Sequence, residues 1–492
     1  MFPPLPSRTT RRLPRAATTD SRMSLPNQPL PNNPLPDRPR LFDLLFSTSE
    51  FLDIFSDRRV LQGMLDFEAA LARAEAAQAI IPLAAAAAIE SQCRAELFDA
   101  AAIAREAAAA GNLAIPLVKS LTASVAGRDP QAARFVHWGA TSQDAVDTGL
   151  ILQLRDAIAH TEADLERFSR ALAALAQTHK TTQMAGRTWL QHALPITFGL
   201  KVAGWYSAIE RHRARLRELR PRVLVLQLGG AAGTLASLGP HALNVVTAVA
   251  KDLNLGVPDL PWHAERDRIA EAGAFYGLLA GTLGKIARDV SLLMQTEIAE
   301  VYEPEAEGRG GSSAMPQKRN PVGSAIALSA ALRVPGLVST LLAAMPQENE
   351  RGMANWHAEW ETLPEIVRLT AGALAQMIQV VEGLEVDTAR MAKNLELTHG
   401  LILAEAVTMA LAAHIGRAAA HELVEHACRS AIQQQRHLRD VLSEDSRVRE
   451  HISQDDLEKI FDPGNYLGLA EAWVDRAVPA PLPPAAPGAK GK

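Results

Sequence analysis

The residues best suited to chemistry in this sequence are gathered in one stretch, GRGGSSAMPQKRNPVGS, at residues 308–324. Glycines surround two adjacent hydroxyls, Ser312 and Ser313. The cation Lys318 and the amide Asn320 follow them. A glycine-hinged loop of this composition suits closing over an anion. Glutamine rather than glycine precedes Lys318, so the pattern is not a Walker A loop, and the serines do not stand in GxSxG. On composition alone, an ordinary surface loop is the alternative.

A second polar stretch, HWGATSQDAVDTG at residues 137–149, stands immediately before a long helical pattern. It offers His137 and the hydroxyls of Thr141 and Ser142. Hydroxyls and backbone amides at a helix N-terminus favour a bound carboxylate. Helix capping without any ligand is the simpler alternative.

A third polar stretch, GRTWLQHALPITFG at residues 186–199, places Thr188, Gln191 and His192 at the predicted start of the next helix. Amide and hydroxyl side chains at such a position are again candidates for binding an anion. A lone histidine such as His192 is more often a structural residue than a catalyst.

Composition excludes several classes of protein. A formal charge of -5 and a pI near 6.3 lack the positive excess of a dedicated nucleic-acid binder. Two cysteines, Cys93 and Cys428, cannot form a disulfide framework and suit a reducing cytoplasm. No apolar run approaches the ~18–20 residues that span a bilayer, so a soluble protein is expected. The sequence HELVEH, at residues 421–426, has neither the HExxH nor the HxxEH spacing of a zinc hydrolase.

Apolar residues at three- and four-residue spacings predict long helices over most of the chain. Residues 150–185 contain no glycine or proline and carry a heptad seam. A second heptad series lies within the proline-free stretch 262–303, and Pro195 could open a third helix that runs to Pro221. Because helices of this length do not bury their seams alone, a helical bundle is expected.

One glycine-rich stretch, RVLVLQLGGAAGTLASLG at residues 222–239, looks like a strand followed by a nucleotide-binding turn. The order of its glycines does not match GxGxxG, and no alternation of strands and helices surrounds it. We therefore expect a glycine-lined bend between two helices.

Taken together, the three polar stretches resemble the motif blocks of the fumarase/aspartase superfamily. The last block of that superfamily has the form GSSxMPxKxNP, which Gly311–Pro321 match. The resemblance spans about residues 41–478. It implies an all-α fold of three helical domains with a central long-helix bundle. The implied boundaries are a disordered extension (1–40), an N-terminal helical domain (41–130), a central bundle with the catalytic loop (131–380), a C-terminal helical domain (381–478) and a disordered tail (479–492).

Within the superfamily, the stretches look most like the carboxymuconate cycloisomerases, with the adenylosuccinate lyases as the nearest competitor. The lyases carry a histidine, their general acid, where this chain has Trp189. A departing amine must be protonated, whereas the carboxylate expelled when a lactone opens has a conjugate acid with a pKa of roughly 4 and leaves unaided. The absence of that histidine therefore fits a cycloisomerase, in which Trp189 would wall the pocket.

The resemblance also implies roles for individual residues. Ser312 and Lys318 would be catalytic, with Ser312 transferring the proton. The implied substrate-binding residues are His137, Thr141, Ser142, Thr188, Gln191, His192, Ser313, Met315, Asn320 and Arg351. No metal or organic cofactor is implied, and the substrate would be a small tricarboxylate.

The spacing of the blocks bears on assembly. A helix over residues 150–185 would be about 54 Å long, and it separates the block at Thr141 from the block at Thr188. If both blocks bind substrate, they must come from different subunits. The superfamily resemblance implies a homotetramer with shared active sites, in the cytoplasm, with neither nucleic acid nor membrane as a partner.

Overall fold

The computed structural model describes residues 40–305, 310–311, 315 and 317–478. Its first helices are α1 (Asp43–Phe46), α2 (Ser49–Ile54), α3 (Asp57–Ala77), α4 (Leu83–Glu90), α5 (Ala100–Ala110), α6 (Ala114–Ala126), α7 (Ser142–Thr178), α8 (Phe198–Val223), α9 (Ala242–Asp252) and α10 (Asp267–Leu293). The later helices are α11 (Val322–Ala344), α12 (Asn355–Glu382), α13 (Thr388–Leu395), α14 (Ala404–Ile415), α15 (Arg417–Gln434), α16 (Leu438–Glu444), α17 (Ser446–Arg449), α18 (Gln454–Ile460) and α19 (Ala470–Ala477).

Short 3-10 helices and strands connect these elements. The 3-10 helices are η1 (Ala95–Leu97), η2 (Ala132–Phe135), η3 (Ala236–His241), η4 (Glu396–Thr398), η5 (Leu401–Leu403) and η6 (Pro463–Tyr466). Strand β1 (Gln183–Thr188) pairs antiparallel with β2 (Gln191–Thr197), and β3 (Val301–Tyr302) pairs antiparallel with β4 (Glu385–Val386). The expected all-α class is confirmed, with two small sheets added.

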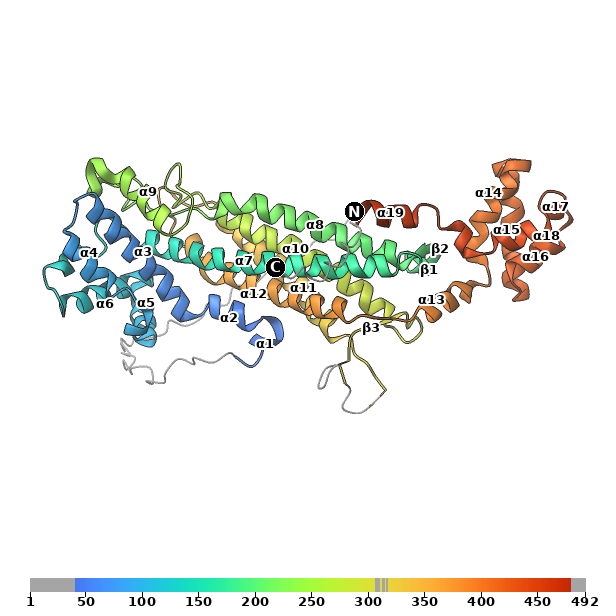
Figure 1. Cartoon of the computed structure of the whole chain (residues 1–492), viewed down its shortest axis with the longest axis horizontal. Helices are drawn as coiled ribbons and strands as arrows, with labels where there is room; N and C mark the ends of the chain where they lie inside the picture. The colour runs from blue at the N-terminus through green and yellow to red at the C-terminus, as the bar shows by residue number, and fades with distance from the viewer. Residues whose placement is uncertain (1–39, 306–309, 312–314, 316, 479–492) are drawn as a thin grey trace, which may run out of the picture. The chain divides into compact units, whose positions relative to one another are not determined.

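Five long helices, α7, α8, α10, α11 and α12, pack against one another as a bundle (Figure 1). Both predicted heptad seams are buried in it. The α7 seam contributes Ile151, Leu154, Ile158, Leu165, Phe168 and Leu172, and the α10 seam contributes Ala272, Tyr276, Leu279, Leu283, Ile286, Val290 and Leu293. Thr161 is the polar residue of the α7 seam, and its Oγ1 lies 3.1 Å from the Tyr276 hydroxyl of the α10 seam. The buried hydroxyl of one seam thus has its hydrogen-bond partner in the other.

The ends of two predicted helices were wrong. Helix α7 begins at Ser142 and stops at Thr178, well before residue 185, and β1 follows it. Helix α8 begins at Phe198, while Pro195 lies inside β2. The chain turns back tightly here: a Cβ on Gly199 would stand 2.6 Å from the Lys180 Cα, so glycine allows α8 to start directly against the end of α7.

The glycine-rich stretch at residues 222–239 is the predicted bend between helices. It joins α8 to α9, with an isolated bridge between Val225 and Gly256. Gly230 has a φ of +68°, a conformation that L side chains rarely adopt. The expectation of a bend rather than a nucleotide-binding turn is therefore confirmed.

A buried ionic network fastens α7 to α10 and α12. The Arg266 guanidinium donates to Asp147 at 2.8 and 3.1 Å and to Glu359 at 2.5, 3.0 and 3.2 Å. All three side chains are almost completely buried. The Trp356 indole N–H donates to the same Asp147 at 2.9 Å. Because one cation serves two carboxylates, the bundle depends on Arg266 at this point.

Helices α14 to α18 surround a second apolar cluster. Its members include Leu411, Leu423, Leu438, Leu442 and Leu457, and Ala185 of β1 joins it. The first cluster takes in most of α3, α7, α8, α10 and α12. The domain boundaries expected from the sequence stay a prediction.

Helix α11 corrects one expectation. By length and composition it could cross a membrane, with a mean hydropathy of 1.7 over its most apolar window. The prediction that no apolar run approaches this length was therefore wrong. One such helix is weak evidence for a membrane protein, because core helices of bundles pass the same test.

Candidate active site

The first group of candidate residues lies at the N-terminal end of α7. Thr141 is the N-cap, and it forms a capping box with Asp144. The Thr141 backbone N–H donates to the Asp144 carboxylate at 2.9 Å. Asn112 donates to the Ser142 hydroxyl at 3.2 Å. The predicted helix cap is thus present, and the Thr141 and Ser142 side chains remain half-buried at its edge.

His137 lies beside this helix end in an unusual conformation. Its φ is +59°, and its Nδ1 is 2.5 Å from the buried carboxylate of Glu68. Burial alone would lower the pKa of His137, but the Glu68 carboxylate outweighs it and raises that pKa. The imidazolium form is therefore stabilised, which makes His137 a candidate cation for binding a carboxylate.

Arg351 reaches the same region through the glycine bend. Its guanidinium donates to the carbonyl oxygens of Gly230 at 3.3 Å and Ala231 at 2.9 Å. Gly230 in turn approaches the residues after His137, since a Cβ on Gly230 would lie 2.9 Å from the Gly139 carbonyl oxygen. The structure thus brings His137, Thr141, Ser142 and Arg351 to one end of α7.

The second group lies on the β1–β2 hairpin. Thr188 pairs with Gln191, and the turn between them consists of Trp189 and Leu190, whose φ values are +52° and +64°. Two consecutive positive φ values are typical of a type I′ turn, which favours asparagine and glycine rather than these residues. Trp189 is 97% exposed and Leu190 77% exposed, so Trp189 walls no pocket within this chain. The expectation that these residues start a helix was wrong.

A buried carboxylate holds the hairpin close to its turn. Arg187 donates to both oxygens of Glu300, at 3.0 and 2.7 Å, and Asn394 donates to Glu300 at 2.8 Å. His192 pairs with Arg187 across the hairpin. Burial, and then the Arg187 charge, lower the pKa of His192, which favours its neutral form.

The third group belongs to the glycine-rich loop. Ser312 and Ser313 lie outside the described residues. The backbone and side-chain amides of Asn320 both donate to the Gly310 carbonyl oxygen, at 2.9 and 3.2 Å, which joins the two sides of the loop. The Lys318 N–H donates to the Met315 carbonyl oxygen at 3.0 Å, and the Lys318 side chain is exposed.

After the loop, the start of α11 is tightly held. The Glu303 carboxylate accepts from the backbone amides of Gly323 and Ser324, at 2.9 and 2.8 Å, and from the Ser324 hydroxyl at 2.7 Å. Arg319 donates to both carboxylate oxygens of Glu385 in β4, at 2.9 and 2.7 Å. These contacts fix both ends of the loop on the same small sheet.

Helix α7 keeps the first two groups apart within one chain. It has 37 residues, so at ~1.5 Å per residue it is about 55 Å long. The group around Thr141 lies at its N-terminal end, and the hairpin with Thr188 follows its last turn, at the opposite end (Figure 1). A single chain therefore does not place Thr141 and Thr188 on the same small molecule.

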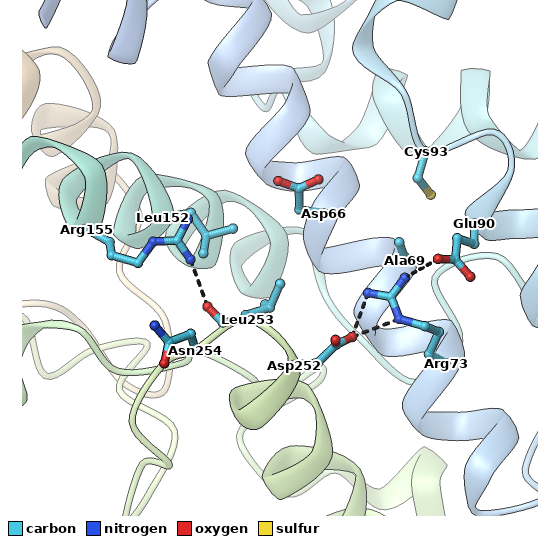
Figure 2. A pocket seen from close by; sticks show the side chains of 10 residues that line it. All are labelled: Asp66, Ala69, Arg73, Glu90, Cys93, Leu152, Arg155, Asp252, Leu253 and Asn254. Atoms are coloured by element: carbon cyan, nitrogen blue, oxygen red, sulfur yellow. Dashed lines mark hydrogen bonds and ion pairs between the residues drawn. The ribbon is translucent and has the colours of Figure 1, made fainter. Parts of the chain in front are cut away.

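A separate cavity of about 370 Å³ lies among α3, α4, α7 and the end of α9, and Figure 2 shows its lining. None of the candidate residues lines it. Arg73 lines it and pairs with Glu90 at 2.7 Å and with Asp252 at 2.6 Å, while Arg155 donates to the Leu253 carbonyl oxygen. Its arginines are thus occupied by groups of the protein itself.

Apart from Asp144, which stands in the polar stretch 137–149, sequence reasoning did not single out the buried carboxylates that hold these groups. Glu68, Asp144, Glu300 and Glu303 all contact candidate residues or their loops. Only Asp144 carried a signal, because it stands three residues after Thr141 as the acidic member of a capping box.

A bundle of long helices with polar groups at helix ends and in connecting loops is the fold of the fumarase/aspartase superfamily of lyases. This chain belongs to that superfamily: the family model described as "Lyase" matches residues 46–336. A further model, "Adenylosuccinate lyase C-terminus", matches residues 400–477.

Individual relatives are similar over nearly their whole length. The chain is 60% identical over 439 residues to a 3-carboxy-cis,cis-muconate cycloisomerase of Pseudomonas aeruginosa, a match that covers 89% of this chain and 96% of the relative. The crystal structure of the 3-carboxy-cis,cis-muconate lactonizing enzyme from Pseudomonas putida matches with a TM-score of 0.85 at 55% identity, covering 89% of this chain and 98% of that one. The β-carboxy-cis,cis-muconate cycloisomerase of Acinetobacter calcoaceticus matches with a TM-score of 0.84 at 47% identity, covering 89% and 99%.

Proposed function

We propose that this protein is a cycloisomerase that converts 3-carboxy-cis,cis-muconate to 4-carboxymuconolactone, in the protocatechuate branch of the β-ketoadipate pathway. The observation that carries this proposal is the 60% identity, over almost the full length of both chains, to an enzyme of that name. Trp189 adds a local argument against the alternative, adenylosuccinate lyase, since it stands where an amine-releasing enzyme needs a general acid.

The reaction is an intramolecular addition. One carboxylate oxygen of the substrate forms a bond to a carbon of the conjugated double bond. The π electron pair moves toward another carboxylate and produces an aci-carboxylate, and one proton then adds to the carbon next to it. The ring oxygen was a carboxylate and is never protonated, which is why no acid is needed at that position.

The protein's main task is to stabilise the charge of the aci-carboxylate with fixed donors. In our proposal Lys318 and Asn320 face this group, and Ser312 delivers the proton. A serine is a weak acid, so its competence depends on the nearby Lys318 cation and on backbone amides of the loop, to which Ser313 and Met315 also belong. No cofactor takes part in this proposal.

The remaining carboxylates of the substrate need donors from both ends of α7. We assign one end to His137, Thr141, Ser142 and Arg351, which lie together. The other donors are Thr188, Gln191 and His192, with Trp189 covering the substrate. Because α7 separates the two groups, each site combines residues of different chains, and we propose a homotetramer in the cytoplasm that has neither nucleic acid nor membrane as a partner.

Purified protein mixed with 3-carboxy-cis,cis-muconate tests the proposal through the loss of diene absorbance. We expect turnover by the wild type and a loss of at least about a hundredfold in Ser312→Ala. Unchanged turnover in that variant would remove Ser312 from proton transfer. Cleavage of adenylosuccinate in a parallel assay, without muconate turnover, would support the alternative.

A further inference from the structure

Asp144 makes more hydrogen bonds than an N-terminal capping role requires. Its Oδ2 accepts from the backbone amides of Thr141 and Gly230, both at 2.9 Å. Its Oδ1 accepts from the backbone amide of Gly229 at 2.9 Å and lies 2.7 Å from His263 Nε2. The carboxylate is completely buried. Three backbone amides thus donate to the two oxygens of this carboxylate, and the His263 ring lies within hydrogen-bond distance of one of them.

Close packing also restrains the Gly229–Ala231 turn, in addition to its hydrogen bonds with Asp144. A Cβ on Gly229 would stand 2.6 Å from the Pro261 side chain, and a Cβ on Gly230 would stand 2.9 Å from the Gly139 carbonyl oxygen. Gly229 and Gly230 therefore sit in contact with the surrounding structure while both of their amides point at Asp144. The position of the carboxylate fixes the direction in which the carbonyl groups of the turn face.

Those carbonyl groups hold Arg351. The guanidinium donates to the carbonyl oxygens of Gly230 and Ala231. A continuous chain of hydrogen bonds thus runs from the Thr141 amide, through the Asp144 carboxylate and the turn, to Arg351. It joins two segments that are more than two hundred residues apart in sequence.

We propose that Asp144 is a positioning residue of the active site. It holds the helix end at Thr141–Ser142 directly, and it holds the Arg351 guanidinium through the Gly229–Ala231 turn. In this arrangement the two groups bind one substrate carboxylate together. The inference rests on the proposed function in one respect, namely that Thr141, Ser142 and Arg351 bind substrate. Asp144 does not touch the substrate.

Asp144→Asn is the direct test, because asparagine keeps the shape and replaces one acceptor with a donor. Thr148→Val is the matched control. Thr148 is buried on the same helix, and its hydroxyl donates to the Gln227 carbonyl oxygen at 2.9 Å and accepts from the Gln227 amide at 3.2 Å. It ties α7 to the same segment two residues before the turn, without contacting the turn.

Each variant is assayed with 3-carboxy-cis,cis-muconate alone and in combination with Arg351→Lys. We expect Asp144→Asn to raise KM by about tenfold or more, with a smaller effect on kcat. We expect the KM of the double variant Asp144→Asn with Arg351→Lys to exceed the higher of the two single-variant KM values by no more than about twofold. Both changes disturb the same contact with the substrate carboxylate, so their effects should not add. The effects of Thr148→Val and Arg351→Lys should multiply. Multiplying effects for Asp144→Asn and Arg351→Lys, or an unchanged KM in Asp144→Asn, would overturn the proposal.

Hydrogen exchange of the unliganded protein supplies a readout that needs no substrate. The amides of Thr141, Gly229 and Gly230 should exchange at least about tenfold faster in Asp144→Asn than in Thr148→Val. Equal exchange in the two variants would refute the anchoring role even in an active enzyme. A wild type that does not act on carboxymuconate would end the proposed function, while the exchange result would still decide whether Asp144 anchors the turn.

If Asp144→Asn does not fold, Gly230→Ala moves the same turn from its other side. The added methyl group meets the Gly139 carbonyl oxygen, and the φ of +68° is unfavourable for alanine. The same rise in KM and the same lack of additivity with Arg351→Lys are expected, and multiplying effects would again count against the proposal.

Discussion

The separation of the two candidate groups by α7 leads to a quantitative prediction about mixed oligomers. One variant carries Thr141→Val and Ser142→Ala at the first end of the helix. A second variant carries Thr188→Val and Gln191→Leu on the hairpin. If each active site takes the two ends from different chains, neither variant has an intact site, but a mixture of the two does.

The expected magnitudes follow from the geometry. Each variant loses two hydrogen bonds to substrate carboxylates, worth about 1.5–3 kcal/mol each, so kcat/KM should fall by about 10²–10⁴-fold. In an equal, randomly mixed population, the chain that supplies the first end is intact in half of the sites. The chain that supplies the second end is also intact in half of them. About one quarter of the sites then regain both ends, and about a quarter of wild-type activity returns.

The assay is muconate turnover after the two variants are unfolded together in equal amounts and refolded. Each variant refolded alone, and the wild type treated in the same way, are the controls. Light scattering before and after refolding checks that the particles have the same mass. If the mixture shows no more activity than the average of the two separate variants, both ends act within one chain and the shared-site reasoning is wrong.

Three further outcomes follow from described contacts. Arg266→Met leaves two buried carboxylates without their cation and should lower the free energy of unfolding by about 3–5 kcal/mol, which denaturant titration measures. Burial, and then the charge of a neighbouring carboxylate, raise the pKa of Glu75 to about 9 from its ordinary value of 4.5. Between these two pH values the folded state keeps a proton that the unfolded state loses, so the free energy of unfolding falls as the pH rises. Glu75→Gln does not titrate, so its melting temperature should fall less than that of the wild type between pH 5 and pH 8. Replacing Trp189 and Leu190 with asparagine and glycine should raise the melting temperature, by relieving about 2 kcal/mol of turn strain, while lowering kcat/KM.

The helical core could be predicted from the sequence because apolar spacing reports directly which face of a helix is buried. Both seams, from Ile151 and from Ala272, are buried as the heptads predicted. The end of α7 could not be predicted in the same way. The β1–β2 hairpin is held by Glu300 contacting Arg187 and by Gly199 against α7, and these are tertiary contacts that leave no periodic pattern.

The candidate site shows the same division. Thr141 was expected at a helix N-terminus from local residue types alone, and it is the N-cap. Its supporting contacts join residues far apart in the chain: His263 and Asp144 are 119 positions apart, and His137 and Glu68 are 69 apart. A single sequence carries no signal for such pairs. The sequence shows the local polar residues, but the buried acids that orient them can be identified only from the three-dimensional structure.

Helix α11 links the apolar surface of the chain to its assembly. Leu332 is 83% exposed although it lies on a helix apolar enough to cross a membrane, and only 28% of that apolar window is buried inside the chain. A lipid-facing helix disfavours charge, yet Arg333 follows directly and pairs with Glu365 of α12 at 2.5 Å. Packing against helices of neighbouring copies covers such a face without placing that ion pair in hydrocarbon. In the homotetramer that we propose, a single set of contacts would meet two separate needs: it would cover the exposed side of α11, and it would bring the Thr188 end of one chain to the Thr141 end of another.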